Sequence, residues 1–284
     1  MRSPFARKKS KSHNNHINDI DIGGVTVERI HTNVELYSPR MLEGNPNVGI
    51  MKLENRTIKI DYYLIDGWVV VEGDILLGRE EDLIKKSEMS TQAIIFEPIS
   101  TVRWPNKVVY YAIDPELPNQ SRVIQAINEW ESKTSMKFVK RESEPNYIYF
   151  IRGDGCSSNV GMIGGRQNIR LGDGCERGNV IHEIAHSIGY WHEQSRDDRD
   201  SFVTIYLENV ISGMEHNFNQ HINDGQDVGF YDYDSIMHYP RKAFSKNGLD
   251  TIVPRDPNVQ IGQRNGLSTK DIQAVDFLYN AALV

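Results

Sequence analysis

The first part of the chain has the apolar pattern of short strands. β-Branched and aromatic residues cluster in three runs bounded by turn residues, which predicts strands at 25–27, 56–64 and 68–71. Residues 80–91 are charged and polar, so we expect an exposed linker there that a protease could cut. The first part of the chain is therefore expected to be mainly β-structure followed by a linker.

After the linker the apolar period changes. Runs of Val, Ile and Tyr predict strands at 107–113 and 147–151, and apolar residues at helical spacing predict a helix over 123–130. A second helix is expected over 268–279, where the run opens with a Ser-x-x-Asp capping pattern. Residues 200–265 show little periodicity and many Gly, Asn, Asp and Pro residues, so we expect irregular structure there.

Composition adds limits on function. The 284 residues are 39% hydrophobic and 25% charged, which is typical of a folded soluble chain. No run approaches the 18 or more apolar residues of a membrane span, so we expect none. The formal net charge of -7 gives no field that would attract nucleic acid, so we expect no nucleic-acid partner.

The N-terminus and the cysteines leave alternatives open. Residues 1–24 read as a disordered basic tail without the apolar run of a secretory signal, so no signal peptide is visible. Either a signal has been removed and the tail is foreign, or the chain is not exported by that route. Cys156 and Cys175 could form one bridge, which would imply an oxidising compartment, or remain two unrelated buried thiols.

The segment 180–192 carries the clearest chemical pattern. On a helix, His182 and His186 project from one face and can bind one cation, and Glu183 lies close enough to reach a water on that metal. Gly189 can end the helix and let the chain turn, which brings His192 round as a third ligand. Three imidazoles leave a coordination position open, which is typical of a catalytic zinc site.

These residues also carry a family resemblance. The pattern over 182–192 is the extended metzincin motif, and its continuation to residue 200 resembles the astacin family in particular. Further segments are similar to that family's Met-turn, disulfide-bearing loop and C-terminal segment, at 235–239, 156–161 with 174–175, and 262–279. The resemblance covers roughly residues 93–279.

The resemblance implies a fold and an activity. It implies an α+β, zincin-like catalytic domain of two subdomains, with a twisted mixed sheet and long helices above the cleft and an irregular lower half. The implied function is a zinc-dependent endopeptidase that hydrolyses protein or peptide substrates, made as a zymogen of the bacterial type. We also expect a secreted, extracellular monomer from this resemblance.

The resemblance also assigns roles to individual residues. It implies that His182, His186 and His192 bind one Zn²⁺ ion and that Glu183 acts as general base. It also implies that Tyr239 ligates zinc at rest and then stabilises the oxyanion. It places Met237 as an apolar floor under the metal and pairs Cys156 with Cys175. His238 adjoins this set, but the resemblance gives it no ligand role.

Latency is implied as well. Residues 25–91 would be a pro-segment whose Asp74, in a Gly-Asp motif, occupies the zinc, and residues 92–284 would be the catalytic domain. An activating protease would cut near Thr91–Ala93, and the buried Glu193 would pair with the new amino terminus.

Two other functions compete with the protease. The chain could be a zinc-stabilised, non-catalytic binding protein on a protease scaffold, or a zinc hydrolase acting on a non-peptide bond. A replaced Glu183 or a lost third histidine would favour the binding protein, and neither replacement is present. The metal and base alone do not distinguish peptides from other substrates.

Overall fold

The computed structural model describes residues 21–22, 25–26, 41, 46–53, 56–86, 95–96, 103–221 and 227–280. Residues 1–33 form one compact unit, in which β1 (Asp21–Ile22) pairs antiparallel with β2 (Val25–Thr26). Residues 34–284 form the second unit, and it contains all the elements described below. Most of the expected basic tail and the expected cut at Thr91–Ala93 lie outside the described residues.

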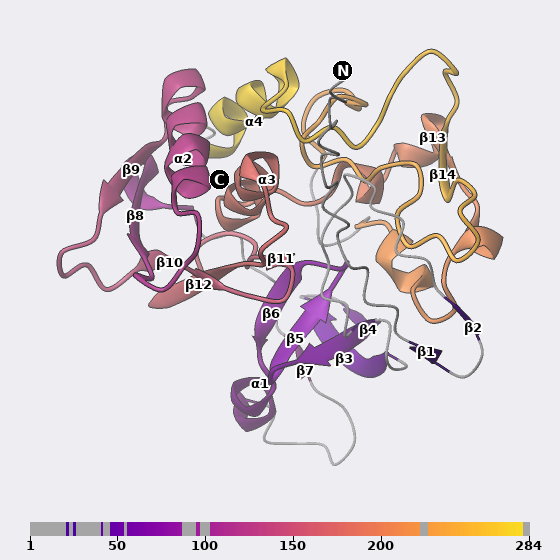
Figure 1. The fold of residues 1–284 in the computed structure, drawn as a ribbon, viewed down its shortest axis with the longest axis horizontal. Coiled ribbons are helices and arrows are strands. Elements are labelled where there is room, and N and C mark those ends of the chain that lie inside the picture. The colour runs from indigo at the N-terminus through magenta and orange to yellow at the C-terminus, as the bar shows by residue number, and fades with distance from the viewer. Residues whose placement is uncertain are drawn as a thin grey trace, which may run out of the picture. The chain divides into compact units, whose positions relative to one another are not determined.

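The second unit contains a five-stranded sheet, which we call the central sheet (Figure 1). Its order is β11-β12-β10-β8-β9, with β11 antiparallel to β12 and the other pairs parallel. The bounds are β8 Val108–Ile113, β9 Lys137–Lys140, β10 Tyr147–Arg152, β11 Cys156–Ser157 and β12 Arg166–Leu171. The strands expected at 107–113 and 147–151 are therefore confirmed.

Three helices pack against this sheet and share an apolar core with it: α2 (Ser121–Lys133), α3 (Arg177–Ser187) and α4 (Thr269–Asn280). Apolar residues from the strands, from α2 and from α3 form one buried cluster, and the indole of Trp130 donates a hydrogen bond to the carbonyl of Ile181 at 3.2 Å. The expected capping of α4 is confirmed, because Ser268 and Asp271 exchange hydrogen bonds of 2.9 Å in both directions.

A second sheet precedes this core, and we call it the N-terminal sheet. Its order is β6-β5-β4-β3-β7, with all pairs antiparallel except β3 with β7. The bounds are β3 Asn47–Leu53, β4 Arg56–Ile65, β5 Trp68–Val71, β6 Ile75–Arg79 and β7 Ile95–Phe96. The strands expected at 56–64 and 68–71 are confirmed.

The linker expected at 80–91 is wrong over its first half. Residues Glu80–Lys86 form helix α1, whose first turn carries Glu80, Glu81 and Asp82. Acidic residues at a helix N-terminus are stabilised by the helix dipole. Leu83 packs against a buried cluster of the N-terminal sheet, so one apolar anchor in a charged run is enough to fix the helix.

The region after α3 is irregular, as expected. It contains short 3-10 turns and one antiparallel pair, β13 (Val203–Ile205) with β14 (Ile252–Pro254). A second apolar cluster joins residues of this region, including Phe218 and Phe244, to residues of the N-terminal sheet, including Tyr63 and Val70. Within the described residues, no helix has both the length and the apolar character needed to cross a membrane.

Helix α3 begins at a very close crossing with the C-terminal segment. A Cβ built on Gly178 would lie 1.8 Å from the carbonyl oxygen of Arg264, so only glycine fits there. The preceding turn is closed by a capping box, in which the Glu176 side chain caps the amide of Asn179 and the Asn179 side chain caps the amide of Glu176. These contacts fix the start of the helix.

Candidate metal centre

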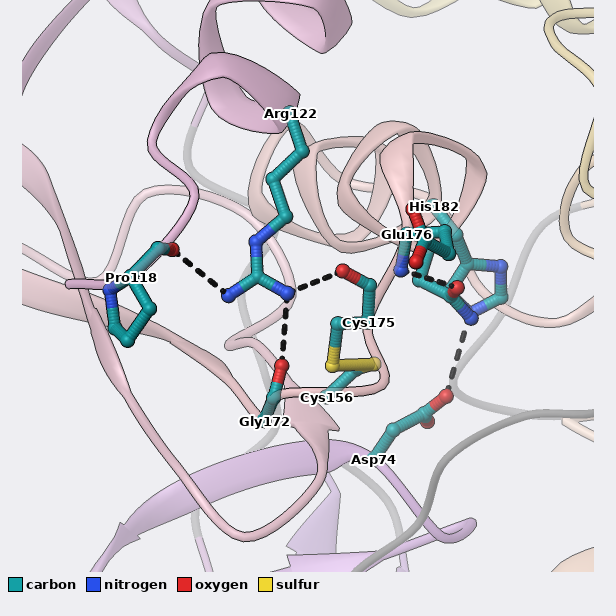
Figure 2. Close-up of a disulfide and its surroundings, with 9 residues drawn as sticks. Asp74, Pro118, Arg122, Cys156, Gly172, Cys175, Glu176 and His182 are labelled. Carbon is teal, nitrogen blue, oxygen red and sulfur yellow. Dashed lines mark hydrogen bonds and ion pairs between the residues drawn. A yellow bond between two sulfur atoms is a disulfide. The ribbon is translucent and has the colours of Figure 1, made fainter. Parts of the chain in front are cut away.

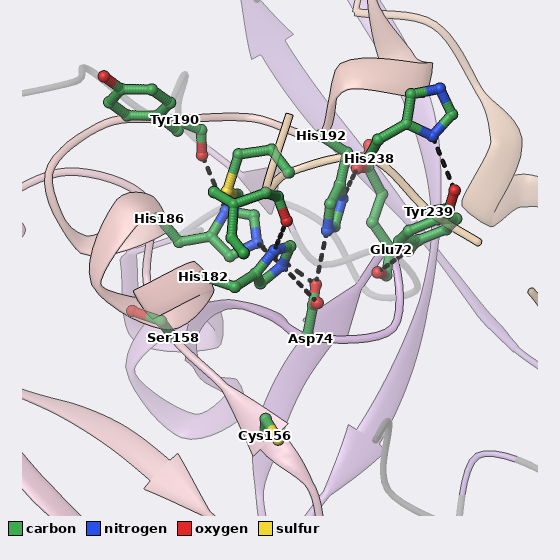
Figure 3. A network of polar contacts seen from close by, with 12 residues as sticks. Glu72, Asp74, Cys156, Ser158, His182, His186, Tyr190, His192, His238 and Tyr239 are labelled. Carbon is green, nitrogen blue, oxygen red and sulfur yellow. Dashed lines mark hydrogen bonds and ion pairs between the residues drawn. The ribbon is translucent and has the colours of Figure 1, made fainter. Parts of the chain in front are cut away.

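Helix α3 and the bend after it bring three histidines together (Figure 3). His182 and His186 lie one turn apart, with ring centroids 4.7 Å from each other. The helix ends at Ser187, and Gly189 then adopts a φ of +116°, which side-chain-bearing residues rarely adopt. The chain turns there and places the ring of His192 with its centroid 4.7 Å from that of His186.

The Nε2 atoms of the three histidines face the carboxylate of Asp74. The Nε2 atoms of His182 and His192 each lie 3.3 Å from an Asp74 oxygen, and that of His186 lies 3.7 Å away. The Nε2 atoms of His182 and His186 are 3.1 Å apart. Metal–ligand bonds of about 2 Å in a tetrahedral site place ligand atoms about 3.3 Å apart, so the separations suit one shared ion.

The other ring nitrogens orient the histidines. The Nδ1 atoms of His182 and His186 each donate to a backbone carbonyl at 2.8 Å, those of Ile236 and Tyr190. The Nδ1 atom of His192 donates to the carboxylate of Glu72 at 2.7 Å. A proton on Nδ1 leaves the lone pair of Nε2 pointing at the centre, as metal binding requires.

Several buried polar atoms at this centre have no hydrogen-bond partner. They are Oδ1 of Asp74, Nε2 of His192 and Oε2 of Glu183. Buried polar atoms without partners are costly, and a bound cation would satisfy the first two. Three imidazoles with one carboxylate suit zinc, so the residues present fit a zinc ion.

Glu183 lies on α3 beside the first histidine and is buried. Burial raises the pKa of its carboxyl well above the usual range, and the charge of Asp74 raises this pKa further. A carboxyl group with a raised pKa next to a metal position can accept a proton and release it again.

The segment 235–239 passes next to the histidines. Met237 is buried, and its carbonyl accepts the amide of Glu193 at 3.1 Å. The ring of Tyr239 has its centroid 4.6 Å from that of His192, and its hydroxyl donates to the carbonyl of Glu72. His238 accepts from Tyr231 and donates to the carbonyl of Tyr239, so both of its ring nitrogens are used away from the centre.

Glu193 directly follows His192 in the chain, and both residues line a cavity. Its carboxylate accepts the amide of Asp232 at 2.7 Å and lies 3.6 Å from the guanidinium of Arg196. Burial raises the pKa of Glu193 to about 8 although Arg196 opposes the shift. The cavity is lined by Glu193, Asp232 and Lys270, among others. Arg196 and Asp198 form an ion pair at 2.9 Å.

A disulfide between Cys156 and Cys175 connects β11 to the turn before α3 (Figure 2). The guanidinium of Arg122 on α2 donates to the carbonyls of Gly172, Cys175 and Pro118 around it. The pairing suggested by the resemblance is thus present. It joins the edge strand to the start of the helix that carries the histidines.

The chain after this edge strand binds the segment that carries Asp74. The amide of Ser158 donates to the carbonyl of Asp74 at 2.9 Å, and the amide of Leu76 donates to the carbonyl of Ser158 at 2.7 Å. The Asn159 side chain adds a bond of 2.6 Å to the carbonyl of Leu76. Residues 74–76 therefore extend the edge of the central sheet, in parallel, and this holds the Asp74 carboxylate at the histidines.

Sequence reasoning missed two polar residues of this centre. Glu72 contacts His192, and His221 contacts Glu72 across 149 positions of the sequence. Glu72 could have been suspected, because it lies two residues from Asp74 in an extended segment. No signal in the sequence indicates His221.

Comparisons with known proteins agree with this geometry. Residues 97–280 match the Astacin peptidase family. The chain is 43% identical over 185 residues to zinc metalloproteinase nas-13 of Caenorhabditis elegans, covering 63% of this chain but only 41% of that protein. It is 36% identical over 231 residues to astacin-like metalloprotease toxin 1 of Loxosceles intermedia, covering 76% of this chain and 83% of that protein.

A solved structure is also similar. High choriolytic enzyme 1, a hatching enzyme zinc-protease from the medaka Oryzias latipes, superposes with a TM-score of 0.58 at 40% identity, covering 63% of this chain and 92% of that one. These three relatives are animal proteins and do not support the expected bacterial type. With three histidines placed to hold one metal ion and a family match over residues 97–280, the chain belongs to the astacin family of zinc metallopeptidases.

Proposed function

We propose that this chain is a zinc-dependent endopeptidase held latent by its own N-terminal segment. The observation that carries the proposal is the convergence of three histidine Nε2 atoms and one Asp74 carboxylate, all ligand atoms lying within 4.8 Å of one another. Membership of the astacin family supports peptide bonds as the substrate class.

In the proposed mechanism His182, His186 and His192 hold the metal. When bound, zinc lowers the pKa of a water and polarises a peptide carbonyl. Glu183 would act as the general base: its carboxylate would accept the proton of the attacking water and pass it to the leaving amine. Its burial on α3, directly after His182, supports this role.

Two residues of the 235–239 segment support the reaction. Tyr239 would ligate the metal in the processed, resting enzyme and donate its hydroxyl proton toward the developing oxyanion during catalysis. In the uncut chain the same hydroxyl donates to Glu72 instead. Met237 would supply the apolar floor beneath the histidines, in keeping with its burial.

We propose residues 25–91 as the pro-segment and 92–284 as the catalytic domain. Asp74 would occupy the coordination position on the metal that the catalytic water needs. An activating protease would cut near Thr91–Ala93. Glu193 would then pair with the new amino terminus. The cavity beside Glu193 and the raised pKa of its carboxyl support this pairing, because an ammonium ion would stabilise the charged form.

The proposed substrates are proteins or peptides, and the proposed state is a monomer. Astacin-family members are mostly secreted or extracellular, and we propose the same location for this chain. The disulfide agrees with an oxidising compartment.

Glu183→Gln tests the catalytic role. Because the amide cannot accept the proton, we expect casein hydrolysis by the processed enzyme to fall by roughly 100-fold or more, with zinc content unchanged. Hydrolysis would be followed with and without a chelator, and zinc by metal analysis. Glu116→Gln, the same change at an exposed position, is the control. Full activity in Glu183→Gln, or chelator-resistant activity in the parent enzyme, would contradict the proposal.

Asp74→Ala tests latency. Without the carboxylate, water can reach the metal, so we expect the uncut chain to gain at least about tenfold in casein hydrolysis. Asp82→Ala changes an exposed aspartate of the same segment and should leave the chain latent. Gel electrophoresis of each sample would verify that the chain stays uncut. An inactive, uncut Asp74→Ala variant would show that Asp74 does not block the site.

A further inference from the structure

Glu72 is a second buried carboxylate of the pro-segment, and it also contacts the metal centre. Its side chain is 5% exposed. One oxygen accepts Nδ1 of His192 at 2.7 Å and the hydroxyl of Ser195 at 3.2 Å, while the other contacts Nε2 of His221. A buried carboxylate is stable only with such partners, and here three converge on it.

His192 differs from the other two histidines in what holds its outer nitrogen. His182 and His186 donate to backbone carbonyls of the catalytic domain. His192 instead donates to a side-chain carboxylate that the pro-segment supplies (Figure 3). A carboxylate behind a metal-binding histidine fixes its tautomer and makes the imidazole a more basic ligand.

The backbone of the pro-segment is bent to make this possible. Glu72 has a φ of +47°, a conformation that favours glycine, and Gly73 follows with +83°. The bend lets Glu72 and Asp74 approach the same imidazole from two sides, at 2.7 Å from Nδ1 and 3.3 Å from Nε2 of His192. A strained residue persists only where the surrounding contacts fix it, and the hydroxyl of Tyr239 on the Glu72 carbonyl is one such contact.

We infer that Glu72 is a positioning residue of the latent metal centre. Through His192 it completes a carboxylate–histidine–metal triad, so that the uncut chain retains zinc more tightly than it would without this carboxylate. The pro-segment thus both blocks the site through Asp74 and tightens it through Glu72. This inference rests on the proposed function in that it takes the three histidines as zinc ligands.

The test is the zinc affinity of the uncut chain carrying Glu72→Gln. Loss of a carboxylate that orients a metal-binding histidine weakens metal binding by about 10- to 100-fold. We therefore expect the zinc dissociation constant to rise by that factor, as measured by competition with a chelating dye. Glu81→Gln, the same change at an exposed position of the pro-segment, should stay within about twofold of the parent. The Co²⁺-loaded variant should also show a shifted visible spectrum, because the ligand strength of His192 changes.

Hydrogen exchange separates this role from simple docking. The amides of Ser158 and Leu76 are bonded only while the pro-segment lies on the sheet edge. Weaker zinc binding with these amides still protected would support the inference. Unchanged zinc affinity, or a loss of affinity only together with loss of this protection, would overturn it. A parent chain that binds no zinc at all would instead contradict the proposed function.

Discussion

Gly73 lies between the two carboxylates that face the histidines and leaves no room for a side chain. Its φ is +83°, and a Cβ there would lie 2.8 Å from the ring of Phe244. We therefore expect Gly73→Ala to push the pro-segment away from the cleft and to raise casein hydrolysis by the uncut chain.

Gly164→Ala is the matched control for this change. Gly164 has nearly the same conformation, with a φ of +84°, but no atom lies within 4 Å of the position that a Cβ would take there. This variant therefore carries the backbone strain without the clash and should remain latent. Equal activity in both variants would show that the gain does not come from the contact with Phe244.

At this scale the sequence predicts residues that share a local pattern. His182, Glu183, His186 and His192 lie within a few residues of each other, so helix geometry alone indicates a common centre. Glu72 and His221 could not be found this way. Their contact depends on how the N-terminal sheet packs against the irregular region after α3, and no spacing of residues in the sequence predicts that packing.

Glu129 on α2 connects three parts of the fold: α2 itself, the start of α3 and the segment before α4. Its carboxylate lies 2.6 Å from Nζ of Lys133 on the same helix and 3.3 Å from the guanidinium of Arg177 at the start of α3. It also accepts the amide of Leu267, just before α4, at 3.2 Å. Burial alone would raise the pKa of Glu129, but the bonds to Lys133 and Leu267 outweigh burial and lower it.

A carboxyl group with a lowered pKa stabilises the folded chain above its unfolded pKa, and this stability is lost as the pH falls. We therefore expect Glu129→Gln to reduce the free energy of unfolding by about 1–2 kcal/mol at pH 7. The difference from the parent should shrink as the pH falls below the ordinary value of 4.5. Urea unfolding between pH 7 and pH 4 measures this, with Glu116→Gln as control. A difference independent of pH would assign the effect to packing.

Helices and strands are predicted correctly where the spacing of apolar residues follows one period. They are missed where polar residues at buried positions interrupt that spacing. The strands β4, β5, β8 and β10 and the helices α2 and α4 follow apolar periodicity and are confirmed. Strand β12 is not predicted, because its inward position 167 is a glutamine that bonds the carbonyl of Gly161 at 3.0 Å, while Arg166, Asn168 and Arg170 alternate on the other face. A buried polar residue that finds a partner inside the fold looks exposed in sequence.

For the whole molecule, the N-terminal sheet contacts both the central sheet and the irregular region after α3. Asp66 lies 3.0 Å from the guanidinium of Arg170 on the central sheet, and the hydroxyl of Tyr63 donates to the carbonyl of Gly213 in the irregular region at 3.2 Å. These contacts do not depend on the connection at residues 87–94. A cut there removes a covalent link but leaves them intact.

We therefore expect the proposed pro-segment to stay associated after limited digestion with trypsin, which can cut after Lys86, immediately before this connection. Size-exclusion chromatography should show the two fragments eluting together. With Asp74→Ala the contacts of this carboxylate with His182, His186 and His192 are lost, so the fragments should separate at least about tenfold faster. Arg152→Ala, which changes an exposed arginine of the catalytic domain, is the control. Immediate separation in the parent protein would mean that the linker alone holds the segment in place.

The crossing at Gly178 limits how the active site could be transplanted. The backbone of α3 meets that of Arg264 one turn before His182, with no side chain in between. A design that grafts the three histidines onto another scaffold should carry over the C-terminal segment around Arg264 as well, because its backbone is in direct contact with the start of the helix. Libraries that vary position 178 should be depleted of metal-loaded clones even when every ligand is retained.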